Sequence, residues 1–66
     1  MERGARSTNL AIIRERRMWT QARLADEAGV SPTTVSGIEN GRISRPHFGT
    51  LRKLAEALGV REEDLK

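Results

Sequence analysis

The side chains best suited to binding a ligand lie on one side of an expected helix over residues 32–39. If Val35 and Ile38 point inward, the opposite side of this helix carries only small or polar residues. These residues are Thr33, Ser36, Gly37 and Asn40. Short hydroxyl and amide groups can reach phosphate oxygens and base edges, whereas a carboxylate there would repel phosphate. The pattern favours nucleic-acid binding over an ordinary solvated helix face, which usually carries Lys and Glu.

Catalysis and metal binding lack the residues that they need. The chain has no cysteine, and His47 is its only histidine. No nucleophile is therefore accompanied by a histidine base and an orienting group. A zinc site built from cysteine and histidine would lack its ligands. We expect no enzymatic activity, no metal and no cofactor.

Arginine dominates the charge of the chain. The 66 residues include 12 Lys and Arg against 9 Asp and Glu, a formal net charge of +3. Basic residues gather in the first quarter, whereas the acidic Glu62, Glu63 and Asp64 lie near the end. A basic surplus favours polyanionic partners, and the planar guanidinium fits phosphate and guanine edges better than an ammonium group does. No apolar run approaches the length of a membrane span, so we expect a cytoplasmic protein.

Helical periodicity and capping residues recur along the whole chain, and they predict the helices that position these residues. We expect helices over residues 8–17, 21–28, 32–39 and 47–58, with a short turn at 61–65. Thr20 and Ser31 are expected N-caps, Gly29 and Gly59 are expected left-handed stops, and Trp19 is expected to cover the core. The expected inner faces comprise Leu10, Ile13, Arg17, Leu24, Ala25, Ala28, Val35, Ile38, Phe48, Leu51, Leu54, Ala55 and Leu58. The sequence predicts a compact all-α bundle of four to five helices.

Only Gly29, Val30 and Ser31 separate the second expected helix from the third. Because one helix ends and the next begins within so few residues, the helix axis must change direction sharply. Val30 is expected to anchor this corner in the core. Helices joined by three or four residues that include glycine form the helix-turn-helix arrangement, whose second helix enters the major groove of DNA. Any small helical protein also needs tight turns, so the corner alone leaves a purely structural interpretation open.

The stretch TQARLADEAGVSPTTVSGIENGR, residues 20–42, resembles the signature of the Cro/repressor (XRE) family of helix-turn-helix regulators. The resemblance extends from about Leu10 to Leu65, which is nearly the whole chain. It implies a helix-turn-helix DNA-binding domain of the phage-repressor type over residues 8–66. Residues 1–7 are expected to form a basic N-terminal arm.

The resemblance also implies roles for individual residues. Gln21 is expected to contact a backbone phosphate at the start of its helix. The expected base-contacting residues are Pro32, Thr33 and Gly37, with Thr34 and Ser36 beside them. The other expected phosphate contacts are Asn40 and Arg42, together with Arg3 and Arg6 of the arm. Arg14 and Glu39 are expected to form an internal ion pair, and Met18 occupies a helix end where left-handed strain is expected.

Pro32 and Gly37 leave the expected recognition helix with few groups for contacting bases. Pro32 has no N–H and no polar side chain, and Gly37 has no side chain at all. Direct contacts then depend on Thr33 and Thr34, including apolar contact with a thymine methyl group. DNA shape and the basic arm are a second source of specificity. Close approach of the Gly37 backbone to DNA is a third.

The family resemblance implies a transcriptional regulator that binds double-stranded DNA as a homodimer on a two-fold symmetric operator, associated with the nucleoid. Symmetric dimers place their recognition helices about 34 Å apart, because one such domain covers only a half-site. The implied dimer surface involves the 43–48 loop and the 60–65 segment, with Ile43, Phe48, Val60 and Leu65 as apolar members. Dimerisation through a further C-terminal domain is one alternative. An antitoxin-type module, with a protein partner and autoregulatory DNA binding, is another.

Overall fold

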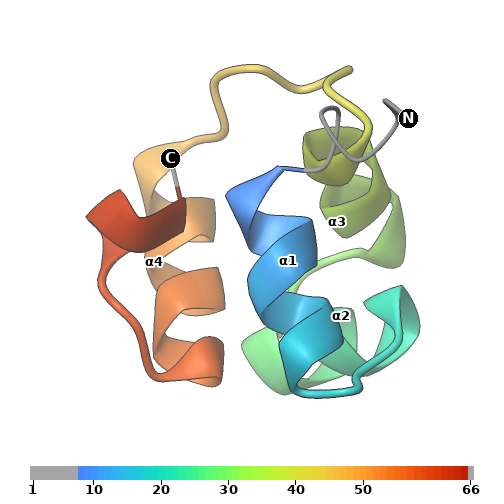
Figure 1. The fold of residues 1–66 in the computed structure, drawn as a ribbon. Helices are drawn as coiled ribbons and strands as arrows, with labels where there is room; N and C mark the ends of the chain where they lie inside the picture. The colour runs from blue at the N-terminus through green and yellow to red at the C-terminus, as the bar shows by residue number, and fades with distance from the viewer. Residues whose placement is uncertain (1–7, 66) are drawn as a thin grey trace, which may run out of the picture.

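The computed structural model describes residues 8–65, which form α-helices and one short 3-10 helix without any strand (Figure 1). The elements are α1 (Asn9–Arg16), α2 (Gln21–Ala28), α3 (Pro32–Glu39), α4 (Phe48–Leu58) and η2 (Glu62–Leu65). The predicted all-α bundle is confirmed, and the bounds of every element lie within one residue of the expected ones. Within the described part of the chain, no helix is long and apolar enough to cross a membrane.

Each α-helix begins at a side chain that accepts a hydrogen bond from an unpaired N–H of the first turn. Thr20 Oγ1, for example, accepts from the Arg23 amide at 3.0 Å. The other N-caps are Thr8, Ser31 and His47. Gly29 and Gly59 end α2 and α4 in the left-handed conformation, with φ of 72° and 71°. Because these caps satisfy helix-end groups locally, the short helices begin and end where the sequence predicts.

One hydrophobic core joins the helices. Its largest fully buried side chains are Leu10, Leu24, Leu54, Leu58 and Val35. Helix α2 packs against both α3 and α4, and α1 contacts α3 and η2. In the view of Figure 1, α1 lies between α4 and the α2–α3 pair. Because α1 and α2 hold α3 from two sides, the remaining side of α3 faces outward.

Two residues expected on the inner faces are exposed. Phe48 is 72% exposed, because it is the first residue of α4 and precedes the turns that pack on the core. Arg17 lies after the end of α1 and is exposed, although its Nη2 donates to the Leu58 carbonyl at 2.7 Å. The buried Arg14 lies on the inner face of α1, and Ile13 is only half-buried.

Met18 connects α1 to the N-cap of α2 in the left-handed conformation. Its φ is 62°, and no other non-glycine residue between 8 and 65 has a positive φ. This conformation brings the Met18 amide to 2.8 Å from the Glu15 carbonyl. The side chain is 90% exposed, so no packing offsets the strain. The expected strain is present and costs about 1–2 kcal/mol.

Candidate nucleic-acid interface

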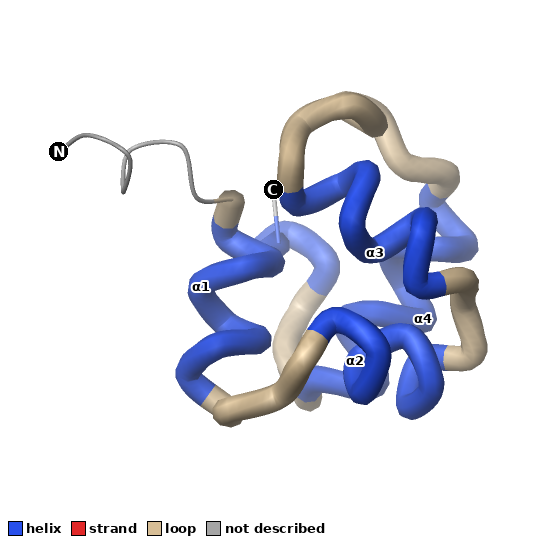
Figure 2. The backbone as a smooth tube through the Cα atoms, turned by 90° about the vertical axis from the view of Figure 1, so that its right-hand side faces the viewer, coloured by secondary structure: helices blue, strands red, loops and turns tan. Residues whose placement is uncertain are grey.

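The corner between α2 and α3 turns the chain within three residues (Figure 2). After Gly29 ends α2, the Val30 amide donates back into α2 at 3.0 Å, and the Val30 side chain packs against the core. Ser31 Oγ then accepts from the Thr33 amide at 3.1 Å. Pro32 occupies the first turn of α3, where its missing N–H costs no intrahelical hydrogen bond. The predicted helix-turn-helix geometry is therefore present.

The outward side of α3 presents hydroxyl groups and no carboxylate. Val35 and Ile38 are buried in the core, as expected. Among the expected base-contacting residues, Pro32 and Thr33 are exposed. Thr34 and Ser36 are half-buried. Glu39 is the only acidic residue of α3, and its side chain is only 7% exposed. An anionic ligand would therefore meet no accessible carboxylate from α3.

The expectation that Gly37 is exposed on the outer side of α3 is wrong, because the loop after α3 covers it. It is buried beneath the side chains of Arg42 and Ile43, which come from the following loop. A β-carbon at position 37 would lie 2.7 Å from Ile43 Cδ1 and 2.9 Å from Arg42 Nη2. Glycine at this position makes room for both side chains. The α3 backbone at Gly37 is consequently not free for close approach by a ligand.

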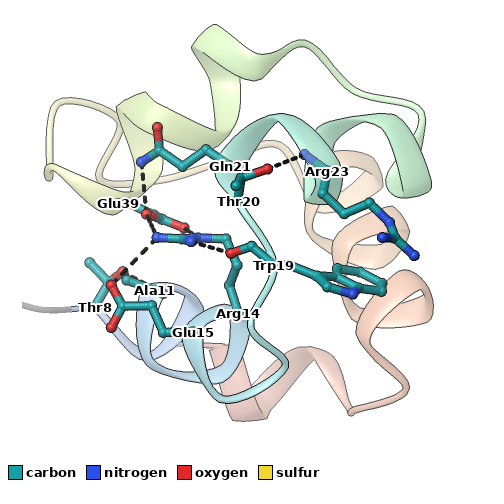
Figure 3. Close-up of polar contacts among 9 residues, drawn as sticks. All are labelled: Thr8, Ala11, Arg14, Glu15, Trp19, Thr20, Gln21, Arg23 and Glu39. Atoms are coloured by element: carbon teal, nitrogen blue, oxygen red, sulfur yellow. Dashed lines mark hydrogen bonds and ion pairs between the residues drawn. The ribbon is translucent and has the colours of Figure 1, made fainter.

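A bidentate ion pair between α1 and α3 holds Glu39 inward (Figure 3). Arg14 Nε donates to Glu39 Oε2 at 2.6 Å, and Arg14 Nη2 donates to Oε1 at 3.0 Å. Arg14 Nη1 also donates to the Trp19 carbonyl at 2.6 Å. The hydrogen bond to Glu39 raises the pKa of Arg14, although burial acts in the opposite direction. The guanidinium therefore remains charged, and the expected internal ion pair is present.

Gln21, the first residue of α2, belongs to the same network. Its Nε2 donates to Glu39 Oε1 at 2.8 Å, and the side chain is half-buried (Figure 3). Glu39 thus fixes the orientation of the carboxamide. A carboxamide nitrogen has two hydrogens, so one donor remains for a further partner. The start of α2 also carries the positive end of the helix dipole, which attracts anions.

Asn40 and Gly41 shape the loop that follows α3. Asn40 Oδ1 accepts from the Arg42 amide at 2.9 Å. Gly41 adopts φ 84°, a conformation that favours glycine. Both Asn40 and Arg42 are exposed. Arg3 and Arg6, the other expected phosphate ligands, lie outside the described residues.

Comparison with known proteins places this geometry in a family. The family described as helix-turn-helix matches residues 10–65, a span that runs from α1 to η2. The chain belongs to the Cro/repressor (XRE) family of helix-turn-helix regulators. The α2–α3 corner and the Arg14–Glu39 pair both lie inside the matching span.

Two relatives from Bacillus subtilis (strain 168) share this helix-turn-helix. The HTH-type transcriptional repressor RghR is 45% identical over 56 residues, which cover 85% of this chain and 42% of that protein. The uncharacterized HTH-type transcriptional regulator RghRB is 42% identical over 56 residues, covering 85% of this chain and 40% of that protein. The chain thus spans about two fifths of the length of these relatives. No solved structure gives a significant match.

The expected dimer surface of this XRE-family domain needs correction. Leu65 is buried at 6% exposure, because η2 folds it into the core. Ile43 is half-buried, since it packs on the core and covers Gly37. Val60 is also half-buried. Phe48 is largely exposed, and its ring stacks on His47 with the ring centroids 4.9 Å apart.

Sequence reasoning missed an arginine cluster around Trp19. The Trp19 ring has Arg17 Cζ at 5.3 Å and Arg23 Cζ at 4.8 Å from its centroid, within the range of cation–π interactions. Arg23 also pairs with Glu27 at 2.9 Å, one turn further along α2. The placement of arginines two residues before and four residues after Trp19 is visible in the sequence. The two arginines come from different segments, Arg17 from the end of α1 and Arg23 from α2.

Proposed function

We propose that this chain is a sequence-specific transcriptional regulator that binds double-stranded DNA with α3 in the major groove. The observation that carries the proposal is the neutral, hydroxyl-bearing outer side of α3, next to the N-terminus of α2. Arg14 holds the single α3 carboxylate inward, so the approach of DNA phosphates is not opposed by Glu39. A helix presented in this way fits the major groove, which is wide enough to admit it.

Gln21 and Asn40 are the proposed phosphate ligands. Gln21 has one donor left after its hydrogen bond to Glu39, and it lies at the positive end of α2. Asn40 is exposed directly after α3, at the same end of this helix as the Gln21–Glu39 hydrogen bond, and its carbonyl oxygen is used by the Arg42 amide. Contacts from these two neighbouring side chains would hold the C-terminal end of α3 against one stretch of the DNA backbone. Arg3 and Arg6 of the N-terminal arm are proposed to add phosphate contacts.

Thr33 is the proposed principal base contact on α3. It is exposed, and it carries both a hydroxyl group and a methyl group that suits a thymine methyl. Pro32, also exposed, offers only apolar contact, and the half-buried Thr34 and Ser36 lie at the margin of this surface. The short side chains leave room for sequence-dependent DNA shape to contribute to specificity.

The regulator is proposed to act as a homodimer on a two-fold symmetric operator, on the bacterial nucleoid. Phe48 supplies a large exposed apolar group at the start of α4, and Val60 adds a partly exposed one after α4. The name of the relative RghR, a transcriptional repressor, favours repression as the outcome of binding.

Affinity for duplex DNA at several salt concentrations tests this proposal. Several phosphate contacts predict that the affinity falls by orders of magnitude between about 50 and 200 mM salt. Thr33→Glu places a carboxylate on the outer side of α3 and should abolish binding. Met18→Glu makes the same charge change at a site that is 90% exposed in the α1–α2 turn, and should retain most of the affinity. A salt-independent affinity, or equal losses in the two variants, would contradict the proposal.

A further inference from the structure

The side chain of Arg42 lies against α3 instead of extending away from the loop. Its Nη2 is 2.9 Å from the place that a β-carbon of residue 37 would occupy. The guanidinium therefore fills the space that the side chain of residue 37 would take in any protein with a larger residue there. Position 37 is one of the expected base-contacting positions, and it has no side chain of its own.

The backbone on both sides of Arg42 is held in place. The Arg42 amide donates to Asn40 Oδ1 at 2.9 Å, and Gly41 turns the chain with φ 84°. The next amide, that of Ile43, donates to the Gly37 carbonyl at 2.9 Å. These bonds fold the loop back onto α3 and direct residues 42 and 43 across Gly37.

The Arg42 guanidinium is also uncommitted. Among residues 8–65 it forms no hydrogen bond and no ion pair, and the residue is exposed. The nearest acidic group in sequence, Glu39, is already bound by Arg14 and Gln21. No acceptor in residues 8–65 takes any of the five guanidinium N–H donors, which an external acceptor can therefore use.

We propose that Arg42 contacts a guanine in the major groove and serves as the specificity-determining side chain that Gly37 lacks. This inference rests on the proposed docking of α3 in the major groove. Guanine presents O6 and N7 there as paired acceptors, and the planar guanidinium donates to both at once. Its position over α3 distinguishes this contact from the phosphate contact expected for a residue beyond the helix end. Glycine at position 37 leaves the guanidinium in this place, whereas a β-carbon there would make it shift.

The first test compares base preferences of the wild-type chain and of Arg42→Ala, each selected from the same pool of duplexes with a randomised core. Arg42→Ala should lose the preference for guanine at one position of each half-site, by about 5- to 150-fold, and keep the other preferences. Arg45→Ala removes another exposed arginine of the same loop and should keep the guanine preference. An equal loss for every base at every position would overturn the inference, because a phosphate contact has that signature.

The second test removes one of the two proposed acceptor atoms, N7 of the guanine. In the selected duplex, 7-deazaguanine replaces the guanine at the position in question, which deletes N7 and leaves the Watson–Crick pair intact. The wild-type chain should bind this duplex more weakly than the unmodified one, whereas Arg42→Ala should bind the two equally. Equal losses in both proteins would overturn the guanine contact.

These outcomes separate the inference from the proposed function. If the wild-type chain selects a symmetric site and Arg42→Ala weakens binding uniformly, α3 docking stands and the Arg42 contact fails. If the wild-type chain selects no sequence, both fail. Gly37→Ala gives a third readout, since a β-carbon 2.9 Å from Nη2 should lower the preference at the same base pair as Arg42→Ala.

Discussion

Arg14 of α1 and Glu39 of α3 face each other through two hydrogen bonds of 2.6 and 3.0 Å, and both side chains are almost fully buried. The pair does two things at once. It joins the first helix to the third, and it withdraws the only carboxylate of α3 from the surface proposed to face DNA. Gln21 donates to the same carboxylate, so the start of α2 is tied to the pair as well.

Glu39→Ala should lower the free energy of unfolding by about 3–5 kcal/mol, because it removes the buried bidentate partner of Arg14 and leaves only the exposed Glu15 carboxylate at 3.5 Å. Chemical denaturation measures this loss. Glu56→Ala is the matched control, since Glu56 pairs with Arg52 at 3.4 Å while both side chains are about two-thirds exposed. That exposed pair is worth only about 0.3–0.5 kcal/mol. Similar losses in the two variants would show that the Arg14–Glu39 pair does not support the fold.

Met18→Gly should stabilise the protein by about 0.5–1 kcal/mol. Glycine removes most of the left-handed penalty of about 1–2 kcal/mol. It also raises the conformational entropy of the unfolded chain, which offsets part of this gain. The Met18 side chain is 90% exposed, so little packing is lost. Met18→Ala keeps the β-carbon and should leave the stability nearly unchanged. A loss of stability in Met18→Gly would contradict the strain at this turn.

Gln21→Ala should weaken binding to every duplex by about 10- to 100-fold, because it removes a hydrogen bond to a charged phosphate. The carboxamide is neutral, so the slope of log affinity against log salt should stay the same. Binding isotherms at three salt concentrations measure both quantities, and unfolding of the same variant checks the loss of the Gln21–Glu39 hydrogen bond. An unchanged affinity would show that Gln21 does not contact a DNA phosphate.

Thr33→Ala should relax the preference at one base-pair position by about 1–3 kcal/mol while the other positions keep theirs. Thr33→Ser separates the two groups of the side chain, because serine keeps the hydroxyl and lacks the methyl. Loss of preference in both variants identifies a thymine methyl contact, and loss in Thr33→Ala alone identifies the hydroxyl. Ser44→Ala, in the exposed loop, is the control. Unchanged preferences in Thr33→Ala would exclude the base contact.

Phe48→Ala should shift the chain toward the monomer in sedimentation experiments and weaken binding to a two-fold symmetric site more than to a half-site. Phe48 is 72% exposed and outside the core, so the monomer should stay folded. Met18→Ala truncates the other large exposed apolar residue within the described range 8–65 and should leave the oligomeric state unchanged. An unaltered monomer–dimer equilibrium in Phe48→Ala would place the dimer contact elsewhere.

Much of the fold follows from local signals that the sequence displays. Thr20, Gly29, Ser31 and Gly59 act at the helix ends where capping chemistry predicts them. The spacing of Val35 and Ile38 correctly identifies the inner side of α3. These features depend on residues close in sequence, so periodicity and capping rules are sufficient to find them.

The errors concern contacts between residues from different elements. Helical periodicity places Gly37 opposite Val35, and it contains no information on the loop that folds Ile43 over it. The sequence predicts Leu65 as an exposed residue of the dimer surface, but η2 packs its side chain into the core. Phe48 fits the apolar stripe of α4 but lies at the helix start, beyond the reach of the core. Each outcome is decided by tertiary packing rather than by local pattern.

Selection of bound sites by the wild-type chain, from a pool of duplex DNA with a randomised core, tests the central claim most directly. Docking of α3 by a symmetric dimer predicts one enriched motif, with two inverted half-sites whose centres lie about one helical turn, or roughly 10 base pairs, apart. A pool that stays unenriched after repeated rounds, although the folded protein is present, would contradict sequence-specific binding by this helix-turn-helix.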